Sequence, residues 1–175
     1  MDKADVVSKC GCVLPEYGEG CKHTIALNPV YTAIQYSSVW ANDPVGRGHG
    51  QGRLNSPQAW SAGANTPGQW FQVFFFAIIF IHSATNLKHD SLKQIDVTDT
   101  VSISGVIIQG RREAAQWVTS YKVRVSTDLK DWVWIECGRV FEGNNDYSTK
   151  VFNLFDRPVK ARYIRIYPET WSVSP

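Results

Sequence analysis

The chain has 175 residues, enough for one domain of ordinary size and a short extension. Its net charge is +2 and only 19% of its residues are charged, so the overall charge gives no support for binding to nucleic acid. Seven tryptophans and an aromatic content of 13% favour a buried core with some rings left for a surface.

The sequence shows neither an export signal nor a membrane span. Residues 1–7 contain no apolar stretch of the kind that forms a secretory signal peptide. The longest apolar run, residues 74–81, is far shorter than the roughly 20 residues that a membrane-spanning helix needs. Taken alone, the sequence therefore predicts a chain without a signal peptide or a transmembrane helix.

Three of the four cysteines lie close together near the N-terminus, at Cys10, Cys12 and Cys21. Their spacing resembles the closing half of an epidermal-growth-factor-like module, which would make residues 1–20 an N-terminal extension. A chance cluster and a zinc half-site without its other ligands are the alternatives. The cluster favours an oxidising, extracellular origin and makes these three the disulfide candidates. Cys137 lies in an apolar stretch and is predicted to be a buried free thiol.

Loops are expected in the first half of the chain. Residues 39–69 are rich in Gly, Pro, Asn and Ser, a composition typical of long connections that carry binding residues. Within them, residues 46–53 alternate glycine with arginine, histidine or glutamine but lack the spacing of a phosphate-binding motif. We interpret this run as a flexible loop.

One segment, residues 73–94, interrupts a strand pattern. If it is removed, residues 69–72 continue into residues 95–97 as one alternating strand. Valine and glutamine at its two ends match the nucleotides expected at intron boundaries, so we interpret it as a retained intron. The alternative is a genuine surface loop, which would expose three consecutive phenylalanines and favour aggregation.

Strand signals dominate the second half. Apolar residues alternate with polar ones over residues 121–125, which is typical of a half-buried strand. Further strands are predicted over residues 132–136, 150–155 and 162–167, with a turn at residues 156–158. Short strands at this spacing, without a sustained helical period, predict an all-β sandwich or barrel.

Several motifs, taken in order, resemble discoidin domains, also called coagulation factor V/VIII type C domains. They are RLNS at 53–56, QWFQ at 69–72, GVIIQGR at 105–111, QWVTSYKV at 116–123, FEGN at 141–144, FDRP at 155–158 and ARYIRI at 161–166. The resemblance implies that residues 21–175 form this domain, a distorted jelly-roll β-sandwich of the galactose-binding-domain-like type. It also implies that the last strand of the family pattern is missing.

The resemblance implies a binding module of the extracellular space or cell surface and not an enzyme. Its expected partners are glycans or glycoproteins of galactose or N-acetylgalactosamine type, in cell adhesion and with multivalent use. Anionic phospholipid membranes and protein ligands such as collagen or a receptor are the alternatives. No cofactor, metal or nucleic acid is expected, because no zinc-ligand spacing or nucleophile motif is present.

Three loops supply the candidate site, because loops at one end of this scaffold surround a ligand cleft in the family. The first loop covers residues 36–40, the second residues 61–66 and the third residues 111–116. The candidate ligand-binding residues are Tyr36, Trp40, Asn65, Arg111, Arg112, Glu113 and Gln116. Where relatives that capture an arginine terminus carry an Asp, this chain has Asn65, whose amide donates and accepts hydrogen bonds and suits sugar hydroxyls. Trp117 and Trp171 are predicted to be structural, Trp117 in the core.

Overall fold

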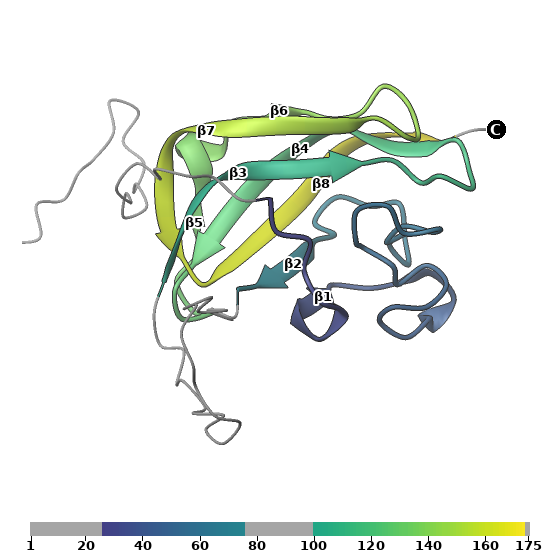
Figure 1. Cartoon of the computed structure of the whole chain (residues 1–175), viewed down its shortest axis with the longest axis horizontal. Coiled ribbons are helices and arrows are strands. Elements are labelled where there is room, and N and C mark those ends of the chain that lie inside the picture. The colour runs from purple at the N-terminus through teal and green to yellow at the C-terminus, as the bar shows by residue number, and fades with distance from the viewer. Residues whose placement is uncertain (1–25, 76–99, 174–175) are drawn as a thin grey trace, which may run out of the picture.

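A computed structural model of the protein describes residues 26–75 and 100–173 (Figure 1). The chain order of its elements is as follows: 3₁₀-helix η1 (Tyr31–Ala33), β1 (Ile34–Tyr36), η2 (Trp40–Asn42), β2 (Phe71–Phe74), β3 (Val101–Gln109), β4 (Gln116–Ser126), β5 (Val133–Trp134), η3 (Ile135–Gly138), β6 (Phe141–Glu142), β7 (Lys150–Ala161) and β8 (Tyr163–Val173). Within the described residues, every helix is a single 3₁₀ turn, and none is long and apolar enough to cross a membrane.

The larger of two antiparallel sheets has the order β1-β2-β8-β4-β5, with β6 paired to another part of β4. Apolar and polar residues alternate along β4, which explains why one face of this strand packs in the core. Tyr121, Val123 and Val125 are buried, whereas Lys122 and Arg124 between them reach the other face. The predicted strand over residues 121–125 is confirmed.

The smaller sheet consists of β3 and β7 and lies over the larger one (Figure 1). Its inward residues, among them Ile103 and Val159, pack against Tyr121, Val123 and Ile164 of the large sheet. Burial of the Tyr121 ring raises the pKa of its hydroxyl, which accepts a 2.9 Å hydrogen bond from the Asn153 amide. Two packed sheets around one core confirm the predicted all-β sandwich.

Two predicted strand ends are wrong. The strand expected over residues 132–136 is only β5, because Glu136 and Cys137 adopt positive φ angles of 46° and 58° and form η3. The turn expected at residues 156–158 lies inside β7 instead. There, residues 155–158 bulge opposite the single residue Ser104, between the pairs Ile103–Val159 and Gly105–Leu154.

The first residues of the predicted insert lie in a strand. Val73 and Phe74 belong to β2, where they pair with Ile164 and Tyr163 of β8. The Phe75 amide then donates a 2.9 Å hydrogen bond to the Arg162 carbonyl. Residues 76–94, the expected strand at 95–97 and the cysteines at 10, 12 and 21 lie outside the described residues.

Cys137 is exposed and disulfide-bonded, so the prediction of a buried free thiol is wrong. It is the single cysteine among residues 26–75 and 100–173. The core position in this turn is taken by Ile135, which is 1% exposed, and the left-handed turn that follows directs Cys137 outward.

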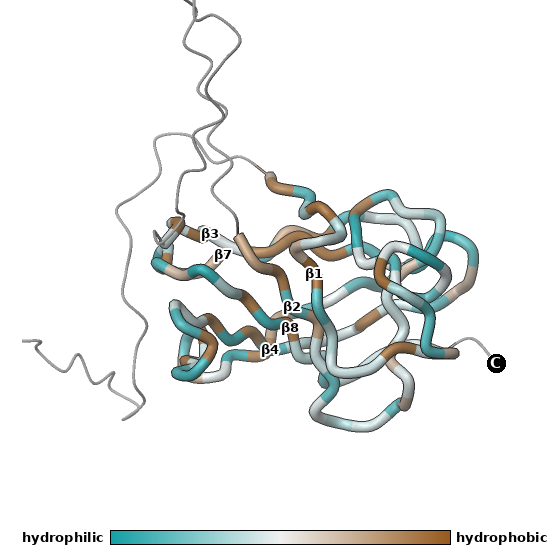
Figure 2. The backbone as a smooth tube through the Cα atoms, turned by 90° about the horizontal axis from the view of Figure 1, so that it is seen from below, coloured by the Kyte–Doolittle hydropathy of each residue, from teal (hydrophilic) through white to brown (hydrophobic). Residues whose placement is uncertain are grey.

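The predicted loops of residues 39–69 are present and gather at one end of the sandwich, where the C-terminal end of β8 also lies (Figures 1 and 2). Residues 46–53, expected to be flexible, are instead tied by hydrogen bonds. The Gly46 amide donates to the Gly50 carbonyl at 2.9 Å, and Gly50 forms an isolated bridge with Trp60. These contacts hold the loops in a defined arrangement above the sheets.

Candidate functional site

A cleft of about 410 Å³ opens at the loop end of the sandwich. Three parts of the chain form its walls: the loop of residues 59–69, the ends of β3 and β4 around residues 109–111 and 116–118, and residues 168–172 of β8. Trp40 of η2 completes it. These segments are far apart in the sequence. They meet because β4 and β8 are neighbours in the large sheet and the isolated bridge between Arg111 and Gln116 holds the chain after β3 beside the start of β4.

Trp40 stands on the first loop with 57% of its surface exposed. The backbone of this loop is unusual, because Ala41 and Asn42 have φ angles of 57° and 54°. Two hydrogen bonds tie it to the second loop, from the Trp40 amide to the Ser61 carbonyl at 2.9 Å and from Trp60 Nε1 to the Ser38 carbonyl at 2.9 Å. The backbone that carries the exposed indole of Trp40 is therefore held in place by hydrogen bonds to the second loop.

Tyr36, a candidate for ligand contact, lies below the loops and is not among the residues that line the cleft. Its ring stacks on Trp60 with centroids 6.4 Å apart, and its hydroxyl donates a 3.2 Å hydrogen bond to the Asp43 carbonyl. Partial burial, with the nearby charge of Asp43, raises the pKa of the Tyr36 hydroxyl. The structure places Tyr36 as a support for the loops.

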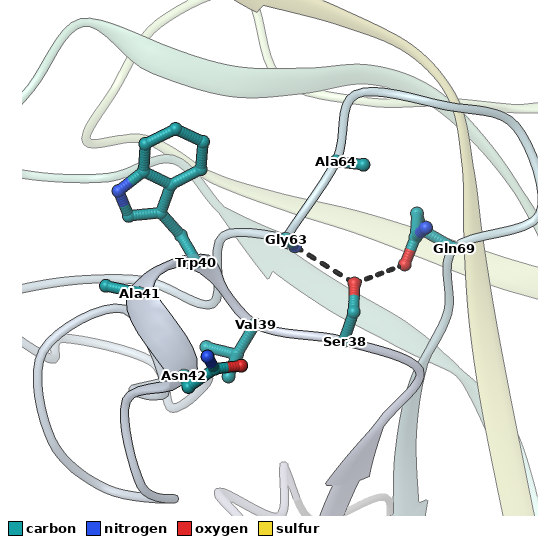
Figure 3. Close-up of a pocket in the computed structure, with 8 residues that line it drawn as sticks. All are labelled: Ser38, Val39, Trp40, Ala41, Asn42, Gly63, Ala64 and Gln69. Atoms are coloured by element: carbon teal, nitrogen blue, oxygen red, sulfur yellow. Dashed lines mark hydrogen bonds between the residues drawn. The ribbon is translucent and has the colours of Figure 1, made fainter.

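Asn65, on the second loop, is exposed and lines the cleft. The base of this loop is held by Ser38, whose Oγ accepts from the Gly63 amide at 2.9 Å and donates to Gln69 Oε1 at 2.6 Å (Figure 3). Ser37 Oγ donates to the same oxygen at 2.6 Å. The amide of Asn65 is thus presented from a loop that polar contacts fix in place.

Arg111 and Gln116 begin and end the third loop, and both line the cleft. Arg111 Nε donates to Gln58 Oε1 at 2.6 Å, and its Nη1 donates to Gln116 Oε1 at 2.7 Å. Arg112 and Glu113 are exposed and do not line the cleft, and Glu113 accepts a hydrogen bond from Gln58. The two adjacent arginines therefore do not face one ligand position.

Two tryptophans predicted to be structural line the cleft as well. Trp117 and Trp171 are half-buried, and Trp117 is not part of the core cluster, so its predicted core position is wrong. Simple alternation from Tyr121 would put Trp117 on the core face. The register of β4 against β8 shifts on both sides of Ser120, and this irregularity re-aims the ring.

A histidine that the sequence did not single out, His49, also lines the cleft. Its Nδ1 lies 2.8 Å from Asp43 Oδ2, and its amide donates to the same oxygen at 2.8 Å. These hydrogen bonds lower the pKa of the Asp43 carboxyl. The pair fastens residues 43–49 beneath the cleft.

A second hollow of about 570 Å³ adjoins the cleft and shares Trp40, Ala64 and Gln69 with it (Figure 3). Figure 3 shows the indole of Trp40 projecting away from the Ser38–Gln69 contact. Flat aromatic faces next to an amide and a guanidinium suit a ligand with both C–H faces and hydroxyls. No group of three metal-ligating side chains occurs within residues 26–75 and 100–173.

Comparisons with known proteins agree with this architecture. The sequence profile of the F5/8 type C domain matches residues 80–175. Retinoschisin of Mus musculus is 33% identical over 154 residues, covering 83% of this chain and 55% of that protein. Discoidin-1 of Dictyostelium discoideum is 46% identical over 67 residues, covering 38% of this chain and 26% of that protein.

Among solved structures, recombinant discoidin II of Dictyostelium discoideum matches with a TM-score of 0.53 and 22% identity, over 79% of this chain and half of that one. An F5/8 type C domain from Bacteroides fragilis matches with a TM-score of 0.51 and 15% identity, over 79% of this chain and 83% of that one. These likenesses concern the fold. The chain spans 30% and 25% of the length of two curated relatives, retinoschisin of Takifugu rubripes and lactadherin of Rattus norvegicus.

Proposed function

Because this chain belongs to the F5/8 type C (discoidin) domain family, we propose that it is an extracellular module that binds galactose- or N-acetylgalactosamine-type glycans in cell adhesion. The family consists of binding modules, and the comparisons indicate no catalytic family. The observation that carries the proposal is the cleft itself, where Trp40, Trp117 and Trp171 stand beside Asn65 and Arg111.

The chemistry of these side chains fits a sugar. A pyranose of galactose type has one apolar C–H face, which packs on an indole ring, and a rim of hydroxyls. Asn65 offers both a donor and an acceptor to that rim, and the N–H groups of Arg111 left over from its contacts with Gln58 and Gln116 add donors. A single open site of this kind binds weakly, so useful avidity requires several copies.

The proposed location outside the cell has separate support. Cys137 is disulfide-bonded, and disulfides persist in oxidising compartments. Lactadherin, retinoschisin and neuropilin-2, proteins of the extracellular space or cell surface, are among the relatives.

A glycan array probed with the full chain, clustered on a multivalent carrier, tests the proposal. We expect binding to terminal galactose or N-acetylgalactosamine, and a loss of at least about tenfold in Trp40→Ala, since stacking and ordering at one aromatic contribute about 1.4 kcal/mol or more. Phe152→Ala is the matched control, because Phe152 is also an exposed ring but lies on β7. Absence of binding to every galactose-type glycan would exclude the proposal.

A second candidate function is binding to anionic phospholipid membranes. It is favoured by the exposed indole of Trp40 on a loop tip and by the exposed cation Arg112 on the neighbouring third loop. Sedimentation with vesicles distinguishes it, because attraction to phosphatidylserine falls as salt is raised, whereas stacking on a neutral sugar does not. Sedimentation that does not depend on phosphatidylserine would contradict this second function.

A further inference from the structure

The outward face of the large sheet carries a group of arginines stacked on aromatic rings. We call it the arginine face. It comprises Trp70, Phe74, Arg124, Trp132, Trp134, Arg162, Tyr163, Arg165 and Tyr167. None of these residues lines the cleft or the second hollow, so the arginine face is separate from the candidate glycan site.

The guanidinium of Arg165 lies between two indoles, 3.9 Å from the ring centroid of Trp132 and 4.1 Å from that of Trp70. Its Nε donates a 2.8 Å hydrogen bond to Gln72 Oε1. A planar cation held between two rings keeps its remaining N–H groups in the plane of the gap. Those remaining N–H groups of Arg165 are the ones that can donate hydrogen bonds to a ligand.

Arg124 repeats the arrangement one strand away. Its guanidinium lies 4.0 Å from the centroid of Trp134 and 5.7 Å from that of Tyr167. Arg124 and Arg165 are direct partners in the register of β4 and β8, so two like charges stand opposite each other. Such a pair destabilises a sheet unless something neutralises it.

Within the described residues, neither arginine forms a salt bridge. The ion pairs present there involve His49, Lys122 and Arg139 and none of the three arginines of the face. The Nε atoms of Arg124 and Arg162 are buried without a hydrogen-bond partner. Lys122, the nearest further cation in register, is already paired with Glu169 at 3.0 Å.

We propose that the arginine face binds a sulfated polysaccharide. Guanidinium groups match the oxygens of a sulfate in a bidentate manner, and a polymer that carries sulfates at intervals supplies several to a row of arginines. Both β4 and β8 are interior strands whose backbone groups are already paired, so a partner reaches this face through side chains alone.

Calorimetric titration of the full chain with a heparin hexasaccharide tests the proposal, with the fully desulfated hexasaccharide as the paired ligand. We expect binding of the sulfated form alone, weakening as salt is raised. Arg165→Lys, which keeps the charge but loses the stacked fork, should bind roughly tenfold more weakly or worse, because an ammonium group cannot replace the bidentate hydrogen bonds of a guanidinium. Arg124→Lys/Arg165→Lys should abolish binding.

Two controls keep the result specific. Arg112→Gln removes an exposed arginine from the third loop and should leave the affinity unchanged. Trp40→Ala should also leave it unchanged, so failure of the cleft proposal and failure of this one are separate observations. Equal binding of the desulfated form, equal loss in Arg112→Gln, or full affinity in the folded double lysine variant would each overturn the proposal. So would binding to phosphatidylserine vesicles or an acidic peptide with the same dependence on Arg165.

Discussion

The two ends of this molecule are held together by different forces. In the sandwich, Tyr121 and Val123 of β4 and Ile135 of η3 are at most 1% exposed and belong to one core cluster. Between residues 37 and 70, by contrast, Gly50 is the one buried residue. The loops rely on hydrogen bonds such as those of Ser38 and Asp43. The scaffold therefore draws its stability from apolar burial, and the binding end is free to vary its exposed residues.

The largest expected effect comes from breaking the core. Phe141 is 2% exposed, with its ring centroid 5.7 Å from that of Tyr121 and 5.8 Å from that of Phe155. Phe141→Ala should lower the free energy of unfolding by about 3–5 kcal/mol, from lost burial and the cavity left behind. Denaturant titration measures it. Phe152→Ala, at a position 66% exposed, should change stability by less than about 0.5 kcal/mol, and equal losses would refute this division between core and surface.

A smaller loss is expected from the hydrogen bond that joins the first and second loops. Trp60→Phe keeps a ring against Tyr36 and Phe71 but removes the donor to the Ser38 carbonyl. We expect a cost of about 0.5–1.5 kcal/mol, the usual net contribution of one hydrogen bond. Denaturant titration measures the cost, and glycan affinity should fall at the same time because Trp40 shares this anchor. Unchanged values for both would show that the loops are held in another way.

The pairing of Asp43 with His49 predicts a local transition in acid. The pKa of Asp43 is lowered in the folded protein, so its contribution to stability is present above the ordinary carboxyl pKa and is lost as pH falls below it. The Trp60 environment should change in that acidic window while the core stays folded. Tryptophan fluorescence measured from pH 6 to pH 2 checks this, with a near-ultraviolet signal for the core. Asp43→Asn should remove the transition, and its persistence would contradict the assignment.

The smallest effect is expected at the strained backbone of the first loop. Ala41 has a φ of 57°, a conformation that glycine adopts without a steric cost. Ala41→Gly relieves strain but adds freedom to the unfolded chain, so the two effects should cancel to within about 0.5 kcal/mol. Thermal unfolding measures this. A loss above about 1 kcal/mol would mean that the Ala41 methyl group makes a contact that matters.

The sequence predicted the parts of the fold in which pattern and packing agree. Alternation at Tyr121, Val123 and Val125 is visible in the sequence because one face of β4 packs in the core and the other does not. The bulge in β7 was interpreted as a turn, because residues 156–158 have a turn composition. The left-handed turn at Glu136 and Cys137 was missed, because neither position is a glycine. Such local deviations depend on the partner strand, which a single sequence does not show.

The candidate site was predictable in outline only. The loops were located from composition, and Trp40, Asn65, Arg111 and Gln116 do line one cleft, whereas Arg112 and Glu113 do not. Whether any of them contacts a ligand stays a prediction. Trp117 was predicted to be in the core, and the irregularity in β4 that places it at the cleft instead depends on the partner strand β8. The supporting contacts of Tyr36 and His49 had no signal in the sequence, since each depends on tertiary geometry.

The bulge in β7 has a consequence for the behaviour of the protein in concentrated solution. In the described part of the chain β3 and β7 form a two-stranded sheet, so no other described strand pairs with the outer edge of β7. Unpaired edges invite other chains to add strands and so to aggregate. Residues 155–158 interrupt that edge with Asp156, Arg157 and Pro158, two charges and a residue that has no amide hydrogen. This interruption makes a continuous intermolecular sheet along β7 unfavourable, and a variant with a shortened, regular β7 should lose that protection.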